Sequence, residues 1–174
     1  MKKRIMGENK KLFLIVIGIA LLLVALILFG KYLAFAVSSG KSSVNSIKNP
    51  IEGLSQEQAI AKFDESFVSY LLSLIGAGRL RNIPFTSNNP KIEVKVSGTI
   101  YSAEIKKGEI VVSKGPIANP DLRIYTSKEE GIKMMKDKGA IKNSFQSGAS
   151  GLEVVAGKPT LLMKGYWSIY GELS

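Results

Sequence analysis

Carboxylates are the first candidates for chemistry in this sequence, because it contains neither Cys nor His. That composition excludes disulfides, thiolate nucleophiles, imidazole bases, zinc sites of the usual ligand sets and haem held by Cys or His. The carboxylates considered as acids or bases are Asp64, Glu65, Glu93, Glu104, Asp121, Glu129 and Glu130. Their spacing is typical of solvated faces, helix caps and first helical turns, and no two form an acid and base couple. We therefore expect no catalytic residue, no metal ligand and no cofactor.

A short glycine-rich segment, GASG at residues 148–151, has the composition of a loop that cradles a phosphate. Such a phosphate loop is followed by a Lys and lies between a strand and a helix. This segment lacks both the Lys and that context. We therefore interpret it as an ordinary loop.

Apolar side chains remain as candidates for function, because a lipid cavity needs an apolar wall with adaptable side chains and few polar groups. The candidates for such a wall are Phe63, Phe67, Leu71, Leu74, Tyr101, Met134, Met135, Phe145 and Trp167. The same residues could simply pack the core, which is the commoner role of a large apolar side chain. Tyr166, Trp167 and Tyr170 could instead form an exposed aromatic patch at lipid headgroups.

The first element that the sequence predicts is a transmembrane helix. Residues 12–30 form an uninterrupted apolar run, LFLIVIGIALLLVALILFG. As a helix this run spans about 28 Å, close to the hydrocarbon thickness of a bilayer. Lys31 can extend its ammonium group to the headgroups, so we predict that the helix covers residues 12–37, after a basic tail over residues 1–11. A buried core helix is excluded because the chain has too few other residues to enclose it.

Two other interpretations of this run involve proteolytic processing. Ala34-Phe35-Ala36 has the small residues that a signal peptidase requires, but the apolar run is longer than the roughly 7 to 15 residues of a signal peptide. We favour a retained anchor over a cleaved signal peptide. Gly7 follows basic residues as in a pilin-like leader. However, polar residues intervene before the apolar run, and Pro50 with the preceding Ser and Gly residues indicates that the helix stops.

The net charge of +10 is concentrated at the N-terminus, where the first eleven residues hold five basic side chains and one acidic side chain. A basic protein beside a membrane most simply attracts anionic lipid headgroups. The remaining basic residues are interspersed with acidic ones, and the sequence has no Arg-rich helix and no recognisable nucleic-acid motif. We therefore expect the lipid bilayer as a partner and not nucleic acid.

A flexible linker is predicted over residues 38–54, which are rich in Ser, Gly, Asn and Pro, and one domain over residues 55–174. Ser55-Gln56-Glu57-Gln58 is a capping box, which begins a helix. The apolar positions of that helix recur every three and four residues as far as Leu74, and Gly76 then ends it. So wide an apolar stripe requires a large apolar partner.

That partner is a predicted sheet. Four short segments between residues 91 and 126 alternate apolar and polar side chains, and Ser97-Gly98 and Lys107-Gly108 have the composition of hairpin turns. A second capping box at Ser127 begins further helices, and LEVVAG with KPTLLMKGYW predicts a last hairpin that turns at Gly157-Lys158-Pro159. The expected fold is α+β, with a mainly antiparallel sheet of five to six strands, wet on one face and covered by helices on the other.

The segment NPDLRIYTSKEEGIKMM, Asn119 to Met135, resembles the sterol carrier protein family of small lipid-binding domains. In that family a strand beginning with an acidic residue, here Asp121, leads to a Ser or Thr cap, here Ser127, and then to an apolar helix. KKGEIVVSKG at residues 106–115 lies where the family has its second hairpin, and the likeness covers roughly residues 63–167. The resemblance implies a five-stranded sheet and helices around an apolar tunnel that holds a fatty acyl chain, a sterol or another lipid.

The sequence departs from that family near its C-terminus. The family closes with a C-terminal helix that gates the tunnel, whereas only residues 168–174 follow Trp167 here, so we expect a tunnel that is open, shallow or lost. Two functions remain. The first is a membrane-anchored module that binds a fatty acyl chain, a sterol-like lipid or an isoprenoid lipid. The second is a ligand-free scaffold whose domain binds another envelope protein.

The distribution of basic residues also predicts the orientation of the chain, because the side of a membrane span with more Lys and Arg stays in the cytoplasm. We therefore expect the N-terminus in the cytoplasm and the domain outside the cell membrane. A protease added to intact cells should remove the domain while a cytoplasmic control protein stays intact. Full protection of the domain would contradict this topology.

Overall fold

The computed structural model describes residues 47–173. The predicted tail and transmembrane helix, residues 1–37, lie outside the described residues, as does most of the predicted linker. Among the helices that are described, none has the length and apolar character needed to cross a membrane. The architecture below is therefore that of the predicted domain and the last residues of its linker.

The sheet has five strands in the order β3-β2-β1-β4-β5. The strands are β1 (Lys91–Val96), β2 (Thr99–Lys106), β3 (Glu109–Lys114), β4 (Leu122–Thr126) and β5 (Gly151–Val154). β1 and β4 pair in parallel at the centre, whereas the other neighbours are antiparallel. The sheet is thus mixed, and the prediction of a mainly antiparallel sheet needs this correction. Hairpin signals identify only the pairing of consecutive strands, and the chain passes through β2 and β3 before β4 returns beside β1.

Both predicted hairpin turns are confirmed. Ser97 and Gly98 have φ values of 47° and 88°, and Lys107 and Gly108 have φ values of 53° and 86°. Two successive residues at positive φ form a type I′ turn, whose twist fits the twist of antiparallel strands. The first turn also positions α4 (Lys128–Lys136), because Ser97 Oγ accepts a hydrogen bond from the Lys128 amide at 3.1 Å.

The apolar side chains of the strands lie on one face of the sheet. Ile92 of β1 is in register with Ala103 of β2 and with Leu122 of β4, and all three are fully buried. The opposite face is polar, and there Arg123 pairs with Glu153 at 2.9 Å. The predicted one-sided sheet is therefore confirmed.

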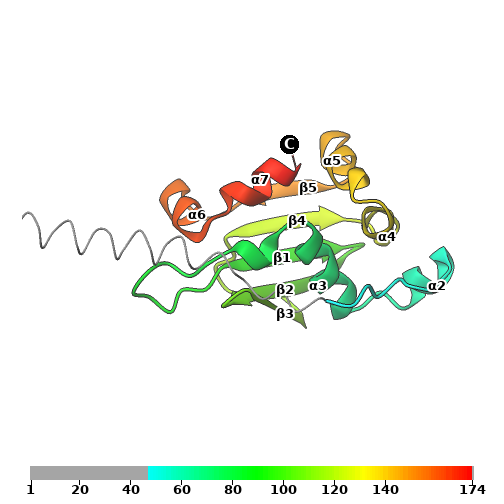
Figure 1. Cartoon of the computed structure of the whole chain (residues 1–174), viewed down its shortest axis with the longest axis horizontal. Helices are drawn as coiled ribbons and strands as arrows, with labels where there is room; N and C mark the ends of the chain where they lie inside the picture. Colours follow the sequence, from blue (N-terminus) through cyan, green and yellow to red (C-terminus); the bar gives the residue numbers. More distant parts are fainter. Residues whose placement is uncertain (1–46, 174) are drawn as a thin grey trace, which may run out of the picture. The chain divides into compact units, whose positions relative to one another are not determined.

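Helices cover the apolar face of this sheet, and α2 packs beside them against α4. The helices are α2 (Gln56–Ala61), α3 (Glu65–Leu74), the short 3-10 helix η1 (Ala77–Arg79), α4, α5 (Gly139–Gln146), α6 (Lys158–Lys164) and α7 (Trp167–Leu173). Figure 1 shows α3 crossing in front of β2 and β3, which it contacts. One cluster of buried side chains joins the strands to α3, α4, α5, α6 and α7, so the domain has a continuous apolar layer between helices and sheet.

The first predicted helix is in fact two helices. The capping box is confirmed at the start of α2, where the Gln58 amide donates to Ser55 Oγ at 3.3 Å and the Ser55 amide donates to Gln58 Oε1 at 2.9 Å. The prediction of one continuous helix is wrong because Asp64 caps a new helix, α3, by accepting a hydrogen bond from the Ser66 amide at 2.9 Å. A short acidic side chain that binds a nearby backbone amide competes with helix continuation.

The middle helices follow the sequence signals. Ser127 caps α4, because its Oγ accepts a hydrogen bond from the Glu130 amide at 3.1 Å. The further helices predicted after Ser127 include α5, which contains Ile141 and Phe145. Local capping and periodicity were therefore sufficient for this part of the chain.

The predicted C-terminal hairpin is wrong in its second half. LEVV contributes to β5, but the segment after Gly157 forms α6 and α7 instead of a strand. Pro159 lies in the first turn of α6, where a helix tolerates Pro, and Gly165 ends α6 with φ +82°. The apolar run TLLM is too short for its periodicity to distinguish a strand from a helix. The chain therefore has a C-terminal helix, α7, which the sequence analysis did not expect.

Candidate functional site

Most of the candidate lipid-binding residues meet in the apolar layer between the helices and the sheet. Phe63, just before α3, lies 5.0 Å from Phe67 of α3 and 6.5 Å from Tyr101 of β2, measured between ring centroids. The buried candidates are Phe63, Phe67, Leu71, Tyr101, Met134 and Met135. The helices and the strands each place their apolar side chains on one face, and these apolar faces pack against each other.

The remaining candidates lie at the margin of this layer or outside it. Leu74 and Phe145 are partly buried and pack against the core cluster. Trp167 is 75 % exposed, and its ring centroid lies 6.0 Å from that of Tyr170. Tyr166 is completely buried, so it takes no part in the exposed aromatic patch that was the alternative prediction. The structure therefore gathers all of the candidates except Trp167.

The polar side chains buried beside the layer already have partners. Thr126 of β4 and Ser144 of α5 both contact Ser150, with oxygen–oxygen distances of 2.8 and 2.7 Å. Every buried side-chain nitrogen or oxygen in residues 47–173 has a hydrogen-bond partner. Ser150 belongs to the GASG segment, where its hydroxyl bonds within the fold. The polar side chains buried beside the layer are therefore already hydrogen-bonded within the fold.

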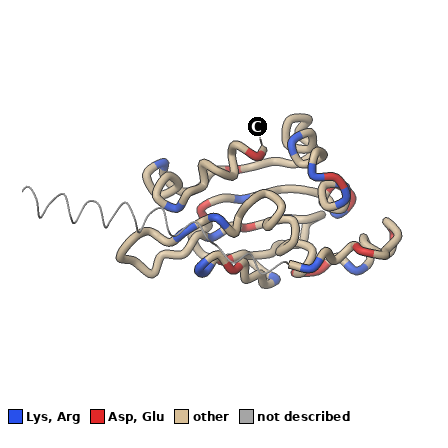
Figure 2. The backbone as a smooth tube through the Cα atoms, in the orientation of Figure 1, with Lys and Arg blue, Asp and Glu red and all other residues tan. Residues whose placement is uncertain are grey.

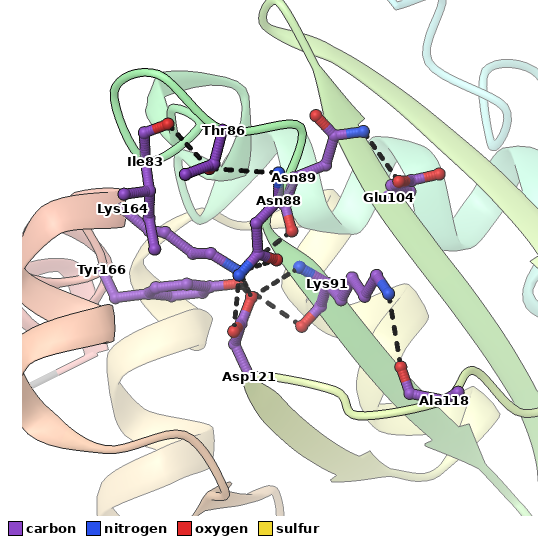
Figure 3. A network of polar contacts seen from close by, with 10 residues as sticks. All are labelled: Ile83, Thr86, Asn88, Asn89, Lys91, Glu104, Ala118, Asp121, Lys164 and Tyr166. Atoms are coloured by element: carbon purple, nitrogen blue, oxygen red, sulfur yellow. Dashed lines mark hydrogen bonds and ion pairs between the residues drawn. The ribbon is translucent and has the colours of Figure 1, made fainter.

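A buried ion pair attaches the C-terminal helices to the beginning of the sheet (Figure 3). Lys164 Nζ lies 2.9 and 2.8 Å from the two carboxylate oxygens of Asp121, and 3.0 Å from both Asn88 Oδ1 and the Asn89 carbonyl oxygen. The Lys164 and Asp121 side chains are only 1 % and 6 % exposed. Tyr166 donates a hydrogen bond to Asp121 Oδ2 at 3.0 Å. One network thus connects the loop before β1, the start of β4 and both ends of the α6–α7 connection.

The charges in this network are compensated, as burial requires. Asp121 Oδ2 also accepts a hydrogen bond from the Lys91 amide at 2.8 Å, so the carboxylate is bound by a cation, a phenol and a backbone amide. Burial raises the pKa of Tyr166, and the charge of Asp121 and its hydrogen bond raise this pKa further. The phenol therefore stays protonated and remains a donor to Asp121.

The sequence analysis missed this network. It placed Asp121 among solvated, capping or helix-dipole residues, whereas the structure buries this side chain. It gave Lys164 no role, because the two residues lie 43 positions apart and no local periodicity connects them. The only available signal was a Lys that directly follows the short apolar run TLLM, and long charged side chains are more often solvated than buried.

A cleft of about 270 Å³ lies between α2 and α4 and is lined mostly by charged side chains. None of the candidate lipid-binding residues contributes to it. Its lining residues are Gln56, Glu129, Glu130, Ile132, Lys133, Lys136 and Asp137.

Comparison with known proteins finds similarity only among solved structures, since no protein-family model and no curated protein matches this chain. The crystal structure of Sterol Carrier Protein 2 Like 2 from Aedes aegypti is 13% identical, with a TM-score of 0.35 over 60% of this chain and 92% of that chain. The solution structure of the palmitated form of that Aedes aegypti protein is 14% identical, with a TM-score of 0.37 over 61% of this chain and 93% of that chain.

A third similar structure is the ubiquinone synthesis protein UbiJ-SCP2, which is 14% identical, with a TM-score of 0.37 over 63% of this chain and 88% of that chain. At such identities and TM-scores, the likeness assigns neither a family nor a ligand to this chain. Its function must be argued from its own residues.

The buried ion pair generates a stability prediction. Lys164→Met should lower the free energy of unfolding by about 3 to 5 kcal/mol, because it leaves the Asp121 carboxylate buried without its cation. Lys133→Met is the matched control, since Lys133 pairs with Glu130 on the surface and such pairs contribute at most about 1 kcal/mol. Urea unfolding followed by circular dichroism measures both.

Adding Asp121→Asn to Lys164→Met should recover part of the loss, since it removes the unpaired charge. A Lys164→Met protein as stable as the Lys133→Met protein would show that the network does not hold the C-terminal helices in place.

Proposed function

We propose that this protein is a non-catalytic, single-pass membrane protein whose domain binds one apolar lipid between α3, α4 and the sheet. The ligand class is a fatty acyl chain, a sterol-like lipid or an isoprenoid lipid. The observation that carries the proposal is the continuous apolar layer, in which buried rings and methionines meet while neighbouring polar groups are already paired.

The side chains of this layer suit an apolar guest. Met134 and Met135 are adjacent on α4 and buried, and the unbranched methionine side chain adapts its shape to what it contacts. Phe63, Phe67 and Tyr101 form a cluster of rings, and the Phe63 ring lies close to Gly131 of α4. Flexible and flat side chains together can rearrange around a chain of methylene groups at lower cost than branched ones can.

The C-terminal helices alter the expected shape of the binding region. Ile169 and Leu173 of α7 belong to the same buried cluster as the strands and α3. This supports a layer that is covered at its C-terminal side, in place of the open or lost tunnel expected from the sequence. A guest enclosed in this way is shielded from water, which favours retention of an apolar lipid.

The proposed location rests on the sequence of the N-terminal segment. The basic tail, the predicted transmembrane helix over residues 12–37 and the predicted linker over residues 38–54 support a domain that is held near the outer surface of the cell membrane. A linker of this length keeps the domain close to one leaflet. The proposed role is therefore presentation or sensing of a lipid and not free transport between membranes.

Lipid binding is tested on residues 42–174, which include the whole core cluster. The fragment should bind the fluorescent fatty acid cis-parinarate, oleate should displace it, and solvent extracts of the protein purified from cells should contain lipid. Ala103→Leu should weaken probe binding about tenfold, because the added carbons would occupy the space of the guest. Ser102→Leu, on the polar face of the same strand, is the control and should leave binding unchanged.

The stability of the ligand-free variants distinguishes a binding layer from a filled core. In a filled core, Ala103→Leu costs about 1 to 3 kcal/mol through overpacking. No probe binding by the unmodified fragment would contradict the proposal. So would a loss of that size in Ala103→Leu together with unaltered probe binding.

A further inference from the structure

Large apolar side chains are exposed at the end of the domain formed by α6, the start of α7 and the loop before β1. Phe85 is 99 % exposed, Trp167 75 %, Leu162 65 % and Met163 42 %. We refer to these four residues as the loop–α6 surface. Single exposed apolar residues are common on soluble proteins, but several large ones at one end of a domain indicate an interaction site.

The loop and α6 are held together by hydrogen bonds. The Arg81 amide donates to the Lys164 carbonyl at 3.1 Å, Arg81 Nε donates to the Met163 carbonyl at 3.3 Å, and Lys164 Nζ binds Asn88. Figure 1 shows the loop and α6 at the same end of the domain. Phe85 lies in the sequence between Arg81 and Asn88, so the loop segment that contains it is hydrogen-bonded to α6 at both ends.

Phe85 is held in a turn of the loop before β1. The Thr86 amide donates a hydrogen bond to the Ile83 carbonyl at 3.1 Å, with Pro84 at the second position of the turn and Phe85 at the third. A positive φ at the third position is what a type II turn requires, and Phe85 has a φ of 62°. The turn therefore presents an aromatic ring that is almost completely exposed to solvent.

The residues that α6 buries determine which of its apolar residues face solvent. Leu161 and Lys164 are buried, one in the core and the other in the ion pair with Asp121, whereas Leu162 and Met163 are exposed. Residues three apart share a face of a helix, so burying the first pair turns the second pair away from the domain. The exposure of Leu162 and Met163 is therefore imposed by the fold.

The charge around this surface indicates an anionic partner. Residues 77–92 and 154–171 contain five basic residues and no acidic residue. Two of these five are neutralised, Arg79 by Glu172 and Lys164 by Asp121. Arg81 and Lys158 are exposed and have no ion-pair partner within the described part of the chain. Figure 2 shows basic residues at both ends of α6.

We infer that the loop–α6 surface docks on a bilayer that contains anionic lipid. Tryptophan and phenylalanine insert favourably at the membrane interface, and Lys or Arg beside them attract anionic headgroups. The inference rests on the membrane location in the proposed function, but it does not require a lipid inside the domain. It adds the face that the domain turns toward the membrane, with Phe85 and Trp167 as the inserting side chains.

Trp167 provides a direct probe, because it is the only tryptophan of the chain. The full-length protein is incorporated into phosphatidylcholine vesicles with and without phosphatidylglycerol, and Trp167 emission is recorded with brominated acyl chains as quenchers. Emission should shift to shorter wavelength and be quenched in the vesicles that contain phosphatidylglycerol, and added salt should reduce both effects.

Variants connect the signal to the named residues. Arg81→Gln should lower the ratio of docked to undocked protein about fivefold in the anionic vesicles. Phe85→Asn should reduce quenching without harming the fold, since Asn adopts positive φ more readily than Phe does. Val111→Ser is the control, because Val111 is exposed on β3 away from this surface, and it should leave quenching unchanged.

Emission from Trp167 that remains long-wavelength and unquenched in anionic vesicles would overturn the inference. A shift that grows with protein density and is insensitive to brominated lipid would also overturn it, since that result indicates contact between copies of the chain. The cis-parinarate assay reports on the interior alone. Docking and lipid binding can therefore fail separately, and the two experiments distinguish which has failed.

Discussion

The ion pair between Asp121 and Lys164 is the interaction on which the C-terminal half of this domain depends. A buried carboxylate and a buried ammonium must be paired and hydrogen-bonded, and here Asn88, Asn89, Tyr166 and the Lys91 amide complete their coordination. The pair therefore brings together the loop before β1, the start of β4 and α6. Together with the burial of Leu161 of α6 and of Ile169 and Leu173 of α7, it fixes these two helices on the core.

The attachment of α6 and α7 has one consequence for the interior of the domain and another for its surface. Toward the interior, α7 contributes Ile169 and Leu173 to the apolar layer that we propose as the lipid-binding region. Toward solvent, α6 exposes Leu162 and Met163 at the end of the domain where Phe85 and Trp167 are also exposed. A domain tethered near a membrane would thus have one apolar layer for a guest and a separate apolar surface for the bilayer.

Sequence patterns predicted the parts of the fold that are determined locally. Both type I′ turns, the strands β1 to β4 and the capping of α2 and α4 follow from short-range signals. The parallel pairing of β1 with β4 was not predictable, because it depends on where a non-consecutive strand returns. The break at Asp64 was missed because the apolar stripe continues across it while the Asp64 side chain caps a new helix. The helix after Gly157 was missed because a short apolar run leaves the period ambiguous.

For the candidate site too, residues placed by local periodicity were predicted, and contacts between distant residues were missed. Periodicity brought Phe67, Leu71, Tyr101 and Met134 into one layer, since each lies on the apolar face of its own element. It placed Trp167 wrongly with them because the strand assigned to residues 158–167 does not exist. Asp121 and Lys164 could not be paired from sequence, because attraction between residues 43 positions apart leaves no periodic trace.

The most direct measurement uses methyl-labelled methionines in residues 42–174. NMR spectra recorded during an oleate titration report separately on buried Met134 and Met135 and on exposed Met163. Binding inside the domain predicts that the Met134 and Met135 methyl signals shift and saturate at one oleate per protein. Shifts confined to Met163, with both α4 methyl signals unchanged, would contradict the claim that the domain encloses a lipid.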